Sequence, residues 1–158
     1  MVEFELATKE DAKTLADISK QAFHYDINYG ATGEGGPYGY DSPEFQEKII
    51  EANITSYYKI LSEDTIIGGF WVRTNLKGRY ILDRIFIKPE FQNQGIGTKA
   101  FEFIFNEFSE AKVWLLDTPI WNQRTRHFYE KLGFEITKII DDGVHYRRKG
   151  SLWIVRYM

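Results

Sequence analysis

Cysteine is absent from all 158 residues of the chain. Without a thiol, the protein can form no disulfide, hold no zinc ion through thiolate ligands and use no cysteine nucleophile. Long apolar runs are absent as well, since no stretch approaches the ~20 apolar residues that a membrane-spanning helix needs. Residues 1–6 also lack the basic start of a secretion signal. We therefore expect a cytoplasmic protein with no membrane partner.

An excess of basic charge is missing too, because 20 Lys and Arg residues face 23 Asp and Glu residues, for a net charge of -3. Nucleic-acid binding draws on clustered basic side chains, and the basic run at residues 147–149 is too short to form such a surface. Nucleic acid is therefore not an expected partner. The length and the hydrophobic share of 43% are ordinary for one packed domain, which we expect to span residues 1–158.

The spacing of apolar residues, together with capping and turn residues, predicts an alternation of helices and strands. Helices are expected over residues 9–23, 43–53, 97–108 and 122–132, and strands over 57–61, 65–74, 79–87, 113–117, 134–140 and 147–157. Short polar connections at 63–64 and 75–78 favour antiparallel hairpins. This order predicts an α/β fold with a mixed, mostly antiparallel central sheet flanked by helices.

A glycine–tyrosine segment, residues 25–41, lies between the first two predicted helices and suits neither a helix nor a strand. Aromatic residues make up 16% of the chain, more than a core of this size needs, so we expect some of them to line a cleft. One interpretation of the segment is a connector. The other is a lid whose Tyr25, Tyr29 and Tyr38 contact a substrate.

The most informative stretch is residues 85–99, which runs from an apolar strand through a glycine loop (residues 92–98) into an amphipathic helix. Gly95 and Gly97 let consecutive backbone N–H groups point the same way, and the helix N-terminus adds a positive partial charge. Such a loop is typical of a diphosphate site. A tight turn without any ligand is the alternative.

Two other phosphate-binding patterns can be compared with this loop. The Walker A pattern is not met, because no glycine is followed at the required spacing by Gly-Lys-Ser/Thr. Residues 95–100 do satisfy the dinucleotide pattern G-x-G-x-x-A, with Asp117 placed 20 residues after Gly97. That pattern should directly follow the first strand of a βαβ unit, whereas here three antiparallel strands precede it and seven residues separate Ile87 from Gly95.

The motifs taken together resemble one known family. Gln92-x-x-Gly95-x-Gly97 follows a strand that ends at Ile87, and Asn122 precedes the run Phe-Tyr-Glu-Lys-Leu-Gly-Phe at residues 128–134. In this order and at this spacing they are similar to the GCN5-related N-acetyltransferase (GNAT) superfamily. The resemblance covers residues 80–136 in its motifs and the whole chain in its element order. It implies the acyl-CoA N-acyltransferase fold.

The resemblance also implies acetyl-CoA as co-substrate and no metal. In that family the strand after the glycine-loop helix splays away, so that the pantetheine arm pairs with the backbone of the preceding strand, here Ile85, Phe86 and Ile87. Backbone amides hold the diphosphate, here those of Gln92, Asn93, Gln94, Gly95, Ile96, Gly97 and Thr98, and Asn122 would bond the cofactor near its thioester. Gln94 departs from the pattern, because its position is often basic in the family.

Tyr129 matches the tyrosine that the family commonly uses as general acid. A phenol, with a reference pKa near 10, can protonate the departing CoA thiolate. The alternative is a packed aromatic side chain on an amphipathic helix.

Asp83 is the first candidate for the base that deprotonates the amine, because it lies on the strand leading to the glycine loop, where some members of the resembled family carry an acid. Strand alternation would place it on one face with Ile85 and Ile87. An ion pair with a neighbouring basic side chain is the alternative role for Asp83. Asp117, at the end of the next strand, is the second candidate for an acid near the substrate.

The expected function is therefore direct transfer of an acetyl group from acetyl-CoA to a primary amine of a small molecule or a peptide. The transfer would pass through a tetrahedral intermediate whose oxyanion is held by backbone N–H groups. A CoA-binding module without turnover is the alternative, and an oxidoreductase would follow from the dinucleotide pattern. The apolar residues 152–157 would suit a homodimer interface or equally a strand buried within one sheet.

Overall fold

The computed structural model describes residues 1–150, except for the side chains of residues 75 and 76. Its strands are β1 (Val2–Leu6), β2 (Thr55–Ser62), β3 (Thr65–Leu76), β4 (Arg79–Ile87), β5 (Val113–Pro119), β6 (Glu135–Ile140) and β7 (Gly143–Lys149). Its α-helices are α1 (Ala12–His24), α2 (Pro43–Glu51), α3 (Ile96–Glu107) and α4 (Gln123–Lys131), with 3₁₀ turns η1 (Lys9–Asp11), η2 (Tyr25–Tyr29) and η3 (Pro89–Phe91). Within the described part, no helix has both the length and the apolar character to cross a membrane.

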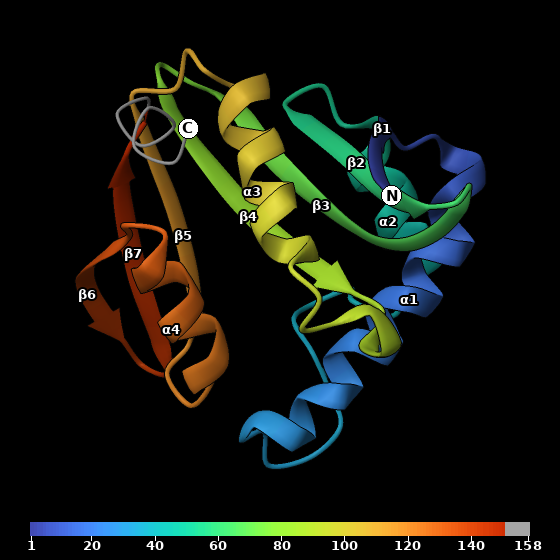
Figure 1. Cartoon of the computed structure of the whole chain (residues 1–158), viewed down its shortest axis with the longest axis horizontal. Coiled ribbons are helices and arrows are strands. Elements are labelled where there is room, and N and C mark those ends of the chain that lie inside the picture. Colours follow the sequence, from blue (N-terminus) through green and yellow to red (C-terminus); the bar gives the residue numbers. More distant parts are fainter. Residues whose placement is uncertain (151–158) are drawn as a thin grey trace.

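The strands form one sheet in the order β1-β2-β3-β4-β5-β7-β6 (Figure 1). Among the described strands, β4 and β5 run parallel and every other neighbouring pair runs antiparallel. The predicted mixed, mostly antiparallel sheet flanked by helices is therefore confirmed.

Two cores cover the two faces of the sheet. On one face, α3 and α4 pack Phe101, Ile104 and Tyr129 against strands β2 to β5 and β7. On the other, α1 contributes Leu15 and Ile18 to a smaller core, and α2 packs its partly buried apolar side chains against it. Each helix buries one apolar stripe, as the sequence periodicity predicts.

The sequence-based element boundaries needed correction at both ends of the chain. Strand β1 was not predicted, although it pairs along β2 and its Phe4 ring stacks on Phe103 with centroids 4.8 Å apart. The last described strand, β7, begins at Gly143 rather than at residue 147, because Asp141 adopts a left-handed φ of 52° and turns the chain into a hairpin with β6. Residues 152–157, the predicted dimer strand, lie outside the described residues.

The helix boundaries differ in smaller ways. The first turn predicted within residues 9–23 is the 3₁₀ turn η1, closed by a capping box in which the Asp11 carboxylate accepts from the Thr8 N–H at 2.9 Å. Helix α2 ends at Glu51 instead of residue 53, because Ala52 is extended with ψ 132°.

Strands β4 and β5 separate along their length, and this separation creates the site. Their pairing is confined to residues 79–81 and 113–115, and Figure 1 shows the two strands diverging beyond it. No described strand pairs with residues 82–87 of β4 on that side. The splaying that the family resemblance implies is thus present, and it leaves backbone N–H and C=O groups available at the edge of β4.

A β-bulge in β4 changes the direction of Asp83. Val72 opposes Leu82 and Trp71 opposes Arg84, so Asp83 is an extra residue in the ladder. Its carboxylate contacts Arg73, which alternates onto the α1 face of β3 with Trp71. The prediction that Asp83 shares a face with Ile85 and Ile87 was therefore wrong, since those two residues pack on the α3 side.

Candidate active site

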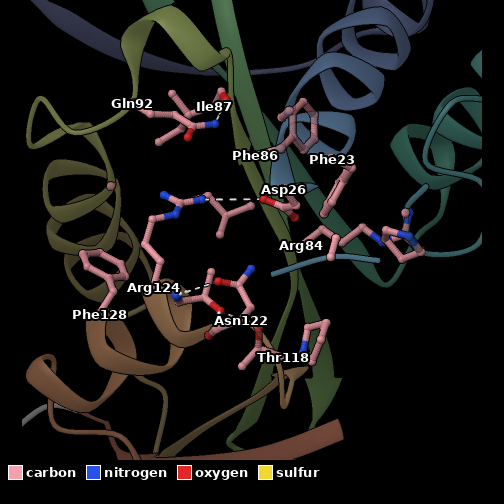
Figure 2. Close-up of a pocket in the computed structure, with 18 of the residues that line it drawn as sticks. Phe23, Asp26, Arg84, Phe86, Ile87, Gln92, Thr118, Asn122, Arg124 and Phe128 are labelled. Atoms are coloured by element: carbon pink, nitrogen blue, oxygen red, sulfur yellow. Dashed lines mark hydrogen bonds and ion pairs between the residues drawn. The ribbon is translucent and has the colours of Figure 1, made fainter. Parts of the chain in front are cut away.

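A pocket of about 940 Å³ opens where β4 and β5 diverge (Figure 2). Its wall is formed by the second half of β4, the glycine loop, the end of β5, the start of α4 and part of the glycine–tyrosine segment. The predicted cofactor-binding residues converge here from three elements: Ile85, Phe86, Ile87, Gln92, Asn93, Gly95, Ile96, Gly97, Thr98 and Asn122 line the pocket. Gln94 does not line it, and its side chain donates to the Glu90 carbonyl at 3.0 Å.

The glycine loop turns sharply into α3. Asn93 and Gly95 both adopt left-handed backbone conformations, with φ values of 62° and 79°. Asparagine and glycine are the residues that tolerate this conformation best. The first amides of α3, at residues 96–98, have no acceptor within the helix, so they are free to bind an anion.

Gly97 has a different role from Gly95, because its φ is not positive. A Cβ atom at Gly97 would lie only 3.2 Å from the ring of Phe128 on α4. The absence of a side chain therefore lets α3 and α4 approach closely beside the pocket.

Two amide side chains fix the ends of the pocket. Gln92 donates through Nε2 to the Ile87 carbonyl at 2.9 Å, and its buried Oε1 has no partner among the described residues. Asn122 is 3% exposed and caps α4, because its Oδ1 accepts from the Thr125 N–H at 3.1 Å. None of the hydrogen bonds within residues 1–150 uses the Nδ2 donors of Asn122, which remain available to a ligand.

Tyr129 lines the pocket from α4 and is almost completely buried. Its ring packs against the rings of Phe101, Phe128, Phe134 and Tyr146, with centroids 5.8 to 6.2 Å away. Burial raises the pKa of its phenol well above the usual value, and the nearby charge of Arg124 only partly offsets this. The hydroxyl is therefore protonated at neutral pH.

The two acids predicted near the substrate differ in their surroundings. Asp83 accepts from Arg73 Nε at 2.6 Å and Nη2 at 3.0 Å, which is the ion pair that the sequence left open as its alternative role. Asp117 is exposed at the end of β5, opposite His145 in β7. Both acids line the pocket.

The glycine–tyrosine segment closes one side of the pocket with residues other than its tyrosines. Asp26 and residues 31–37 line the pocket, whereas Tyr25, Tyr29 and Tyr38 do not, and Tyr38 is 84% exposed. Part of the segment, Tyr25–Tyr29, is the 3₁₀ turn η2, which the sequence did not predict. Contact between these tyrosines and a substrate stays a prediction.

The same segment is held in place near its C-terminal end and at Gly30. His24 and the Tyr40 hydroxyl are hydrogen-bonded at 2.8 Å, and Arg84 on β4 donates to the Tyr38 carbonyl at 2.6 Å. Gly30 has a φ of 111° and lies against Trp121, since a Cβ atom there would be 3.0 Å from the Trp121 carbonyl oxygen. The segment therefore bridges the gap between α1 and the start of α4.

Arg84, Arg124 and Asp142 are charged residues of the pocket that had no role in the sequence-based prediction. Asp26 also lines the pocket, and the sequence suggested only that the acids of residues 25–41, Asp26 among them, would suit a cationic amine. The Asp26 carboxylate and Arg124 Nη2 face each other across the pocket at 3.8 Å, as Figure 2 shows. The guanidinium of Arg124 also lies 4.2 Å from the centre of the Tyr29 ring. Burial raises the pKa of Asp26 to about 6, although Arg124 lowers it. No local pattern distinguishes these residues from solvated charges.

A GNAT acetyltransferase family model matches residues 21–134 of this chain. Among curated proteins, the uncharacterized protein YrkN of Bacillus subtilis (strain 168) is 29% identical over 153 residues, which cover 92% of this chain and 81% of that protein.

Solved structures share the fold at low sequence identity. PaiA N-acetyltransferase from Thermoplasma acidophilum, in complex with coenzyme A, aligns with a TM-score of 0.78 and 18% identity over 94% of this chain and 99% of that chain. The ribosomal-protein-S18-alanine N-acetyltransferase of Escherichia coli aligns with a TM-score of 0.79 and 15% identity over 96% of each chain. Spermidine N-acetyltransferase from Vibrio cholerae, in complex with CoA and spermine, aligns with a TM-score of 0.73 and 14% identity over 97% of this chain and 98% of that chain.

The structural likenesses establish the fold, while the family model reaches from the end of α1 to Phe134, three residues beyond α4, and so includes every motif that lines the pocket. Because that match spans well over half of the chain, the protein belongs to the acetyltransferase (GNAT) family.

Proposed function

We propose that residues 1–158 form a single domain that transfers an acetyl group directly from acetyl-CoA to a primary amine of a small molecule or a peptide. One observation carries this proposal: a single pocket joins the glycine loop, the unpaired edge of β4 and the buried Tyr129. These supply a place for a diphosphate, backbone groups for an extended arm and a proton donor.

The residues of the pocket fit acetyl-CoA as co-substrate. The free amides at the start of α3 suit its diphosphate, and the edge of β4 at residues 85–87 suits its pantetheine arm. Gln92 Oε1 and Asn122 Nδ2 are further polar groups that no described residue engages. Coenzyme A is also named as the ligand of two neighbours of the same fold, those from Thermoplasma acidophilum and Vibrio cholerae. Acetyl-CoA supplies the acetyl thioester.

In this proposal Tyr129 acts on the leaving group. When the amine nitrogen bonds to the thioester carbonyl carbon and the carbon–sulfur bond breaks, the sulfur leaves as a thiolate and needs a proton. The Tyr129 hydroxyl donates that proton, and its raised pKa ensures that the proton is present at neutral pH. Backbone N–H groups at the edge of β4 would stabilise the negative charge on the carbonyl oxygen. Asp83 and Asp117 remain the acids predicted from the sequence for the amine side.

The proposal is tested by measuring coenzyme A binding calorimetrically and thiol release from acetyl-CoA with a panel of amines. Polyamines and alanine-terminated peptides belong in the panel, because enzymes of this fold include a spermidine and a ribosomal-protein-alanine N-acetyltransferase. We expect Tyr129→Phe to lower kcat by about 100-fold or more while CoA affinity stays unchanged.

Tyr146→Phe is the matched control, since Tyr146 is an equally buried tyrosine whose ring contacts Tyr129 but whose hydroxyl bonds Glu130 at 2.7 Å outside the pocket. Its kcat should stay within about twofold of wild type, because loss of one such bond costs only about 1 kcal/mol of stability. CoA binding without acetylation of any amine would favour the non-catalytic binding module. A chain that does not bind CoA would contradict the interpretation of the glycine loop.

A further inference from the structure

The pocket contains a buried acid that has no hydrogen-bond donor. Asp26 belongs to η2, and its side chain is only 15% exposed. None of the hydrogen bonds among residues 1–150 involves its carboxylate, and Arg124 Nη2, at 3.8 Å, is too distant for one. A carboxylate that is largely shielded from water and has no such bonds is destabilised in its charged form. A cationic hydrogen-bond donor bound in the pocket would relieve this cost.

Asp26 differs in this respect from every other acid that lines the pocket. Asp83 is held by two hydrogen bonds from Arg73. Asp117 and Asp142 are exposed, and the Glu34 side chain is 70% exposed. Asp26 therefore combines a largely buried side chain, access to the pocket and a carboxylate that accepts no hydrogen bond, although Arg124 lies 3.8 Å away.

The position of Asp26 relates it to the proposed proton donor. Asp26 lies on the α1 side of the pocket, while Arg124 and Tyr129 reach the pocket from α4 (Figure 2 shows Asp26 and Arg124). The charge of Asp26 contributes to the raised pKa of the Tyr129 phenol, so the two groups are within electrostatic reach of each other. The pocket space between η2 and α4 is thus bounded by a carboxylate that accepts no hydrogen bond and by a protonated hydroxyl.

We propose that Asp26 is a catalytic residue that binds the ammonium group of the acceptor and takes its proton before the amine attacks. This inference rests on the proposed function. The proton moves from the ammonium nitrogen to a carboxylate oxygen of Asp26, and the freed lone pair forms the bond to the thioester carbonyl carbon. The carbon–sulfur bond then breaks and the sulfur takes the Tyr129 proton. The nitrogen of the new amide loses its surplus proton, which restores the Tyr129 hydroxyl, and Asp26 returns its own proton to solvent.

The pH dependence of the reaction rate should show the ionisation of Asp26. The charged and titratable groups that share the pocket are Asp83 and Arg84 on β4, Asp117 on β5, Arg124 and Tyr129 on α4, and Glu34 and Asp142 in loops. Of these, Arg124 is the group that lowers the pKa of Asp26, while burial raises it to about 6. Because Asp26 must be ionised to accept a proton, kcat/KM should fall below about pH 6.

The test compares full-length wild type with Asp26→Asn, using any amine that the wild type acetylates, across pH 5 to about 9. Asparagine keeps the shape of the side chain but cannot take the proton. We expect kcat/KM at neutral pH to fall by about 100-fold or more, the limb near pH 6 to vanish and CoA affinity to stay unchanged. Asp17→Asn, at an exposed position on α1 outside the pocket, is the matched control and should keep both rate and profile.

Arg124→Gln separates catalysis from a structural role. If Asp26 only fastens η2 to α4, removing either partner should lower the rate equally and leave the acidic limb in place in both variants, which would overturn the proposal. A limb abolished by Asp83→Asn and retained in Asp26→Asn would also overturn it. Absence of acetylation by wild type would reject the proposed function and this inference together, whereas a wild-type profile in Asp26→Asn would reject the inference alone.

Discussion

Gly95 shows how one residue shapes the proposed diphosphate site. It adopts a left-handed conformation immediately before α3, and a Cβ atom there would meet nothing within 4 Å. The requirement for glycine is therefore one of backbone conformation alone, because an L-residue in this region costs roughly 1 to 2 kcal/mol.

Gly95→Ala should lower the stability by about 1 kcal/mol and weaken CoA binding, since relaxation of the turn would redirect the amides at the start of α3. Thermal unfolding and calorimetry with CoA measure the two effects. Gly33→Ala is the matched control, because Gly33 also lines the pocket and has open space around it but has no positive φ. Equal CoA affinity in wild type and Gly95→Ala would contradict the assignment of this loop to the diphosphate.

Residue-scale prediction from the sequence succeeded where a residue is part of a pattern. The glycine loop, Asn122 and Tyr129 stand in motifs, and the structure brings Asn122, Tyr129 and every residue of the loop except Gln94 to one pocket. Asp26 stands in no motif, and an acid in a glycine-rich segment is ordinarily a solvated charge. Its burial depends on where η2 lies against α4, which no local pattern contains.

At the scale of elements, α4 depends on Asn122 for its first turn and presents the same side chain to the pocket. The cap uses the Oδ1 atom, whereas the proposed cofactor contact uses the Nδ2 donors. The two roles are therefore separable by substitution.

Asn122→Ser should keep the helix cap and lose the amide donors, so its melting temperature should stay near wild type while CoA affinity falls. Asn122→Ala should lose both, with a cost of about 1 kcal/mol in stability in addition to the weaker binding. Unfolding curves of the two variants measure the contribution of the helix cap, and CoA titrations measure the contribution of the amide donors. A serine variant that binds CoA as tightly as wild type would limit Asn122 to its role in the helix.

Strand β4 shows where element-scale prediction fails. Alternation along a strand predicts which face of the sheet a side chain is on only while the hydrogen-bond ladder is regular. The bulge at Asp83 interrupts the ladder. Tyr80 and Leu82 face the α3 core before the bulge, and Ile85 and Ile87 face it afterwards. A bulge arises from pairing with β3, so the sequence of β4 alone does not reveal it.

At the scale of the whole molecule, the buried Asp26 links the site to stability. Its folded pKa of about 6 lies above its ordinary value of 3.8, so between these two pH values the folded chain binds more protons than the unfolded chain. The free energy of unfolding then decreases as the pH rises through this window, and the ionised carboxylate destabilises the fold above it.

Asp26→Asn should therefore be more stable than wild type by about 1 to 2 kcal/mol at pH 7.5, a value that allows for partial screening by solvent. At this chain length it corresponds to a melting temperature higher by a few degrees, and the gain should shrink toward pH 4. Calorimetric or spectroscopic melting at the two pH values measures it, with Asp17→Asn as a control that should show no such change. A gain that is equal at both pH values would contradict a buried, ionised Asp26.

The mixed sheet, most of its elements and the glycine loop could be predicted from the sequence, because each depends on residues that are near one another in the chain. Periodicity reports which face of an element is apolar, and motifs report local backbone geometry. The splaying of β4 from β5 entered only through the family resemblance. The ion pair of Asp83 at the bulge and the pairing of Asp26 with Arg124 were decided by the tertiary structure, since they join residues 10 and 98 positions apart in the chain. Only the packing of distant elements determines which charged side chains are buried next to each other.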